Sequence, residues 1–94
     1  MFLAGMSSER PTLKEQYEDI LTRAGALLKE TGCGWKDVAA ISLFLHRSKD
    51  PEQLLRDVAA FVPVPLGNAE IEFVDGYSSP GKFLEIEITA RKPG

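Results

Sequence analysis

The sequence is poor in cysteine and histidine, the residues from which disulfides and most zinc sites are built. Its 94 residues include one cysteine and one histidine. A single cysteine cannot form an intramolecular disulfide, and a zinc site needs three or four ligands that this chain does not supply. We therefore expect no metal and no cofactor, and the absence of disulfides indicates a cytoplasmic protein.

Long apolar runs and basic clusters are also missing. No apolar stretch approaches the roughly 20 residues of a membrane span, and the opening MFLAGM has neither the basic start nor the length of a signal peptide. The net charge is −3, and the lysines and arginines are scattered, whereas phosphate binding requires a basic face. These absences argue against a membrane or a nucleic acid as a partner.

What remains is the composition of one small folded domain, residues 1–94. The hydrophobic fraction of 44% is enough for a core, and no repeat or linker divides the chain. A core built from so few residues is small, so association with copies of the same chain would add to its stability.

Two segments have the period of amphipathic helices, and each has recognisable ends. The first begins after Thr12, which we predict to cap the helix while Glu15 reaches back in a capping box. It ends before Gly32. The second begins after Asp50, with Gln53 completing a variant of the same box.

Four other segments, residues 1–5, 38–47, 69–74 and 82–91, have the composition and alternation of strands. Both faces of 38–47 are mostly apolar, so we expect that strand to be covered on both sides. The order β-α-β-α-β-β predicts an α+β domain. We expect the last two strands to form an antiparallel hairpin, with both helices packed on one face of the sheet.

Glutamates alternate along the last two predicted strands. Glu85 and Glu87 share one strand face because residues two apart project the same way, and Glu70 and Glu72 do so on the preceding strand. A solvated outer face explains them most simply. The alternative is that one of them, its pKa raised by burial or by its neighbours, handles a proton.

Three single residues carry weaker signals. Cys33 follows a helix C-terminus, whose partial negative charge disfavours a thiolate. His46, at a strand end, indicates polar packing more than a general base, and Trp35 is expected to pack beneath its turn rather than to form a stacking platform.

The loop before the closing strand nearly matches a phosphate-binding loop, through Gly76, Gly81 and Lys82. Phe83 stands where that motif needs Ser or Thr, and a strand pattern follows instead of a helix. We expect a plain connection between strands.

Several segments, taken in order, resemble the RidA/YjgF family, whose members include imine and enamine deaminases. LFLHRSKDPEQLLRDVAAF is similar to the family's strand, turn and second helix, and LLKETGCGWKDVAAISLFL to its helix end and following strand. PGKFLEIEITARK resembles the closing strand, and FLAGM the first strand end. The resemblance implies a ferredoxin-like or chorismate-mutase-like subunit, a homotrimer, and small-molecule clefts between subunits.

The resemblance also implies roles for particular residues. Glu85 corresponds to the glutamate that positions the hydrolytic water. Asn68 stands where active deaminases have a carboxylate-binding arginine, Glu70 where many members have cysteine, and Gly5 is retained beside Ala4, which replaces a serine. We therefore expect Glu85 as the catalytic residue and Asn68, Gly5 and Glu70 as substrate-binding residues.

Two functions remain open at this point. The chain is either a RidA-like trimer that hydrolyses reactive imine or enamine intermediates, or a catalytically inactive binding or assembly module with the same fold. The missing arginine favours the second. So does the chain's start at its FLAG strand, where the hairpin that precedes this strand in the family has no counterpart.

Overall fold

The structure, a computed structural model, describes residues 2–63, 68–75 and 81–91. Within these ranges the elements follow the predicted order: β1 (Phe2–Ser7), α1 (Leu13–Glu30), a 3-10 turn (Trp35–Asp37), β2 (Val38–His46), α2 (Pro51–Phe61), β3 (Ala69–Val74) and β4 (Leu84–Ala90). Neither helix is both long and apolar enough to cross a membrane.

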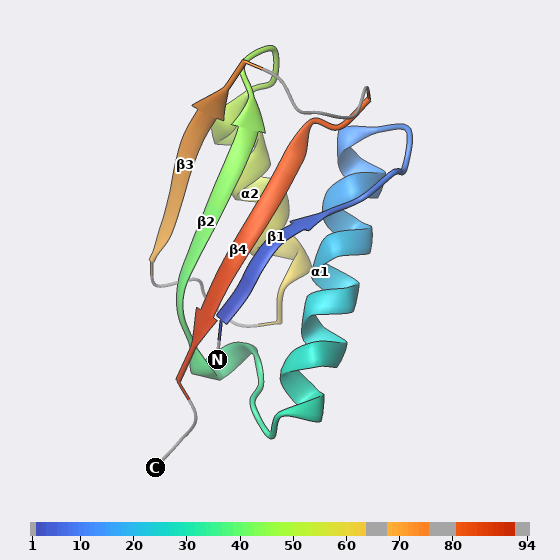
Figure 1. Cartoon of the computed structure of the whole chain (residues 1–94). Helices are drawn as coiled ribbons and strands as arrows, with labels where there is room; N and C mark the ends of the chain where they lie inside the picture. The colour runs from blue at the N-terminus through green and yellow to red at the C-terminus, as the bar shows by residue number, and fades with distance from the viewer. Residues whose placement is uncertain (1, 64–67, 76–80, 92–94) are drawn as a thin grey trace.

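The strands form one mixed sheet in the order β1-β4-β2-β3 (Figure 1). β4 runs antiparallel to both β1 and β2, while β2 and β3 are parallel. The predicted hairpin between the last two strands is therefore wrong, since β2 lies between β3 and β4. The α+β class is confirmed, and the topology is the chorismate-mutase-like one of the two that the resemblance allowed.

β4 lies in the interior of the sheet, and its apolar side chains are buried deeply. Leu84, Ile86 and Ile88 are at most 1% exposed, whereas Phe73 on β3 is 47% exposed. A central strand has neighbours on both sides that exclude water from its side chains, and an edge strand has only one. The central place of β4 therefore buries its apolar side chains more fully than the edge place of β3 does.

Both helices pack against the same face of the sheet, as predicted (Figure 1). The core between the layers joins the inner faces of α1 and α2 to those of β2 and β4, and its largest fully buried aliphatic side chains are Ile20, Leu21, Leu28, Ile41, Leu43, Leu45, Leu54, Leu84, Ile86 and Ile88. The expectation that β2 is covered on both sides is wrong for the single chain: Ser42 and Phe44, on its other face, are only half-buried.

The first helix begins and ends as its sequence predicts. The Thr12 hydroxyl accepts a hydrogen bond from the Glu15 N–H at 3.1 Å and donates to the Glu15 carboxylate at 3.0 Å. Thr12 therefore caps the helix as predicted, but the Glu15 carboxylate accepts from the Thr12 hydroxyl rather than from the Thr12 backbone N–H, as a full capping box requires. Gly32 follows the helix with φ +81°, a left-handed conformation that glycine adopts without steric cost.

The second helix is capped by Asp50, whose carboxylate accepts hydrogen bonds from the N–H groups of Glu52 and Gln53 at 3.0 and 3.3 Å. The predicted second half of the box is wrong. The Gln53 side chain instead donates forward along the helix, to Asp57 at 2.8 Å.

A β-bulge at Gly5 keeps the apolar residues of β1 on the inner face. Leu3 pairs with Ile88 and Met6 with Ile86, so β1 has one more residue than β4 between these pairs. Without the extra residue, side chains three apart would point to opposite faces. Gly5 has φ +55°, which a residue with a Cβ adopts at a cost.

We expect Gly5→Ala to lower the free energy of unfolding by about 1 kcal/mol through backbone strain alone. An added Cβ would meet nothing within 4 Å there, so no clash contributes. Gly34→Ala is the matched control, because its Cβ also meets nothing but its φ is −145°. Urea unfolding of both variants checks this, and an equal effect at the two positions would contradict it.

Candidate functional site

The face of the sheet that the helices leave open carries all four glutamates. The strand registers place them in two rows across β3, β2 and β4: Glu70–Ser42–Glu87 and Glu72–Phe44–Glu85. Because β2 separates the acids of each row, their backbones are about 10 Å apart. The carboxylates of β3 therefore do not lie directly beside those of β4, as they would if the two strands were adjacent. Glu70 and Glu72 are exposed to solvent.

Glu85 and Glu87 share this face but have different neighbours. Glu85 is half-buried near the start of β4, between Ser7 on β1 and the aromatic ring of Phe44 on β2. Glu87 has Ser42 beside it on β2. Glu87 is half-buried as well, so what distinguishes Glu85 is the aromatic neighbour in its row and its place next to a strand end.

Asn68 lies at the other end of the sheet. The side-chain amide of Asn68 donates to the Ala39 carbonyl at 3.3 Å. The backbone carbonyl of Asn68 accepts from the Ile41 N–H at 2.9 Å. Ala39 and Ile41 lie near the start of β2, whereas Glu85 pairs with Phe44 near the end of that strand. A single chain does not bring Asn68 and Glu85 together.

The other two predicted binding residues are also dispersed. Gly5 lies in the β1 bulge opposite Glu87, and Glu70 projects from the edge strand β3. The predicted site residues thus share one open face without forming one pocket in the single chain.

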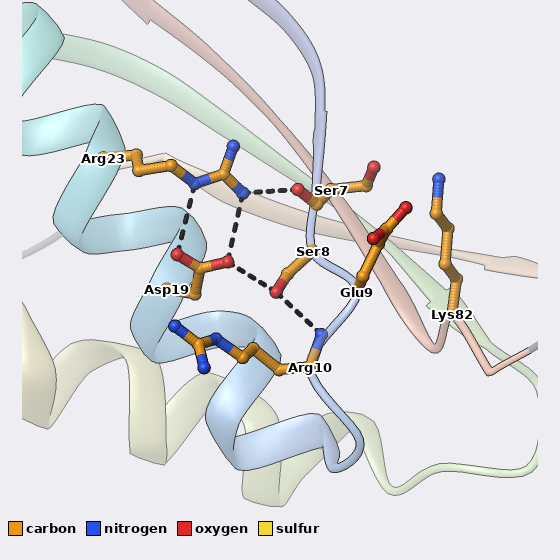
Figure 2. A pocket seen from close by; sticks show the side chains of 7 residues that line it. All are labelled: Ser7, Ser8, Glu9, Arg10, Asp19, Arg23 and Lys82. Atoms are coloured by element: carbon orange, nitrogen blue, oxygen red, sulfur yellow. Dashed lines mark hydrogen bonds and ion pairs between the residues drawn. The ribbon is translucent and has the colours of Figure 1, made fainter.

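A cleft that sequence reasoning missed lies between the end of β1 and α1 (Figure 2). It is open, has a volume of about 640 Å³, and is lined by polar and charged side chains. At its centre the Asp19 carboxylate accepts the Ser8 hydroxyl at 2.6 Å and the Arg23 Nε–H at 3.3 Å. Arg23 also donates to the Ser7 carbonyl, so these contacts tie the end of β1 to the helix.

The pKa of Asp19 lies below its ordinary value. The Ser8 hydrogen bond contributes most, the positive charges of Arg23 and Arg10 add to it, and burial opposes them. The carboxylate is therefore ionised and already satisfied. Glu15 and Glu18, with Asp19, line a second cleft beside Arg10. Acidic and basic side chains lie together in both clefts, and the hydrogen bonds of Asp19 and Arg23 join β1 to α1, which indicates a structural role.

Two of the three single residues discussed in the sequence, His46 and Trp35, make packing contacts. His46 Nδ1 accepts from the Ser48 N–H at 3.1 Å and lies 2.7 Å from its hydroxyl, and the ring meets Phe83 edge to face. Trp35 packs against the core, its indole close to Gly25 of α1. Cys33 is half-buried.

The near match to a phosphate-binding loop has no structural support among the described residues. Gly76 lies outside them, and Gly81 leads into the strand β4 rather than a helix. Over the same ranges, no three His, Cys, Asp or Glu side chains are grouped so as to hold a metal ion.

Comparison with solved structures identifies the fold. NMB1025 from Neisseria meningitidis, described as a YjgF protein family member, is 27% identical, with a TM-score of 0.84 over 99% of this chain and 79% of its own. The chain therefore has the fold of YjgF/Rid family proteins. Rv2704 from Mycobacterium tuberculosis, of the YjgF/YER057c/UK114 family, shows the same fold at 22% identity, with a TM-score of 0.77 over 95% of this chain and 75% of its own.

A third YjgF/Rid match is YyfB from Yersinia pestis, a Rid family protein of unknown function. It is 21% identical, with a TM-score of 0.75 over 96% of this chain and 76% of its own. No family model matches the sequence, and no curated protein does. The structure confirms the family resemblance noted in the sequence. Because Rv2704 and YyfB are only 22% and 21% identical to this chain, the likeness to them shows the fold and not the function.

We expect Ser8→Ala to raise the pKa of Asp19 towards its ordinary value. Because the folded-state pKa is depressed, the stability it contributes is fully present above the unfolded pKa of about 3.9 and is lost as pH falls through the folded pKa. Ser8→Ala should therefore flatten the acid dependence of unfolding below about pH 4. Ser48→Ala, whose hydroxyl contacts His46 instead, should leave the carboxyl titration of Asp19, followed by NMR, unchanged.

Proposed function

We propose that this protein hydrolyses reactive imines or enamines in a pocket formed between copies of the chain, with Glu85 orienting the attacking water. One observation carries the proposal: Glu85 is half-buried on the open face, yet neither of the two clefts described above is lined by it. A second chain docked on this face would enclose Glu85. The family resemblance favours a homotrimer as the assembly.

The chemistry needs one carboxylate and one water. Glu85 accepts a hydrogen bond from the water, takes its proton as the oxygen attacks the C=N carbon, and returns it to nitrogen. The carbinolamine that forms then collapses to a carbonyl compound and ammonia. Phe44 beside Glu85 supplies an apolar wall that a flat, conjugated substrate can lie against.

The substrate class is an imine or enamine without a simple carboxylate. A guanidinium is suited to hold a carboxylate through two parallel hydrogen bonds, and Asn68, at the position of the family's arginine, lacks that charge. Its amide is engaged with Ala39. The exposed carboxylates of Glu70 and Glu72 on the same face would repel an anion.

We expect Glu85→Gln to lower the rate of ammonia release from imines generated in the assay by about 10²- to 10⁴-fold, the usual worth of a positioned acid–base group. Glu87→Gln is the matched control, since it removes the same charge from the same strand and face. Its rate should stay within about threefold of wild type. No ammonia release by wild type, or equal losses in both variants, would defeat the enzyme proposal.

The second candidate is an assembly module without catalytic activity. It is favoured by Asn68, which has no charge and uses its amide to hold the start of β2. Such a module would form the same trimer by light scattering and release no ammonia from any imine. A strict monomer would contradict both candidates, because each buries the open face against a second chain.

A further inference from the structure

We propose that Gln16 is a positioning residue, which fixes the segment leading into β4 and thereby the place of Glu85 on the sheet. The inference rests on the proposed function for its catalytic consequence. Its structural part stands on three hydrogen bonds of one buried side chain.

Gln16 belongs to the first turns of α1, and it is 0% exposed. Both hydrogens of its amide are used: one is donated to the Arg10 carbonyl at 2.8 Å and one to the Gly81 carbonyl at 2.7 Å. Its oxygen accepts the Phe83 N–H at 2.9 Å. A single side chain thus joins the segment after β1 to the segment before β4.

The contacts on Phe83 come from two sides. Its N–H is held by Gln16 from the helix layer, and its carbonyl accepts the His46 N–H at the end of β2, at 2.8 Å. The next residue, Leu84, is 0% exposed in the core. With both backbone groups of Phe83 held and Leu84 packed, little freedom remains for Glu85, which follows directly.

Gln16 and Glu85 lie on opposite sides of the sheet, so they do not touch. Gln16 acts through the backbone from Gly81 to Leu84. Gly81 has φ +84°, and its carbonyl is one of the groups that Gln16 captures. No other side chain among the described residues is shown hydrogen-bonded to the backbone of residues 81–83.

The first measurement does not depend on activity. In Gln16→Met, which keeps length and helix propensity, we expect faster amide exchange at Phe83 and shifted NMR signals with lower order parameters at Leu84 and Glu85. Val58→Ala is the control, since it removes core packing from the other helix. Unchanged signals at residues 83–85 in Gln16→Met, or the same changes in Val58→Ala, would overturn the inference.

The second measurement tests the catalytic consequence. Misplacing a catalytic group by about 1 Å can cost on the order of 100-fold, so kcat of Gln16→Met should fall about 10- to 100-fold, with KM within about threefold. Loss of folded protein alone would lower the apparent kcat of Val58→Ala equally. Equal losses, or a change confined to KM, would overturn the positioning role.

These measurements distinguish failure of the proposed function from failure of the positioning role of Gln16. If wild type releases no ammonia, the proposed function fails, and the NMR comparison still decides whether Gln16 fixes Glu85. If Gln16→Met does not fold, wild-type hydrogen exchange decides instead. A Phe83 amide protected like that of Leu45 supports the inference, and one exchanging as fast as an exposed loop amide overturns it.

Discussion

Burial of β4 between β1 and β2 is the constraint on which the rest of the structure depends. Leu84, Ile86 and Ile88 meet the helices on one face of this strand, so the glutamates between them must face the other way. That alternation sets which side of the sheet can carry a site. It also requires β1 to keep Leu3 and Met6 inward, which the bulge at Gly5 achieves.

The open face therefore derives its chemistry from a packing requirement. In a strand whose alternate residues are buried, the remaining positions share the opposite face, and here they include the acids. Phe44 and Ser42 of β2 separate those acids into two rows. The half-buried environment of Glu85 then comes from its neighbours across the sheet, not from any residue close to it in sequence.

Local patterns predicted the elements well, because helix caps and alternating side chains depend on residues a few positions apart. Thr12, Gly32 and Asp50 mark helix ends through hydrogen bonds and backbone angles that the sequence specifies locally. Strand pairing was predicted less well. The last two strands are adjacent in sequence, but β4 pairs with β1 and β2. Apolar content does not separate the two strands, since β3 and β4 each have four apolar residues, so no local signal places β4 at the centre.

For the candidate site too, features set by local spacing could be predicted, and features set by strand pairing could not. The shared face of Glu85 and Glu87 followed from spacing, whereas the distance of Asn68 from them depended on the pairing of β3 with β2. Gln16 was not among the residues predicted to matter. Its position between Leu13 and Ile20, on the buried side of the helix, was the sign that its amide must find partners inside the protein.

The place of β4 also governs how the chain can fold. β1 and β4 stand at opposite ends of the sequence, yet they pair directly, and β2 lacks its antiparallel partner until β4 arrives. Until then the backbone N–H and C=O groups along the facing edges of β1 and β2 lack the partners that β4 supplies. Pairings so distant in sequence raise the contact order and slow folding, because the core is completed only when β4 pairs with strands that lie far before it in the chain.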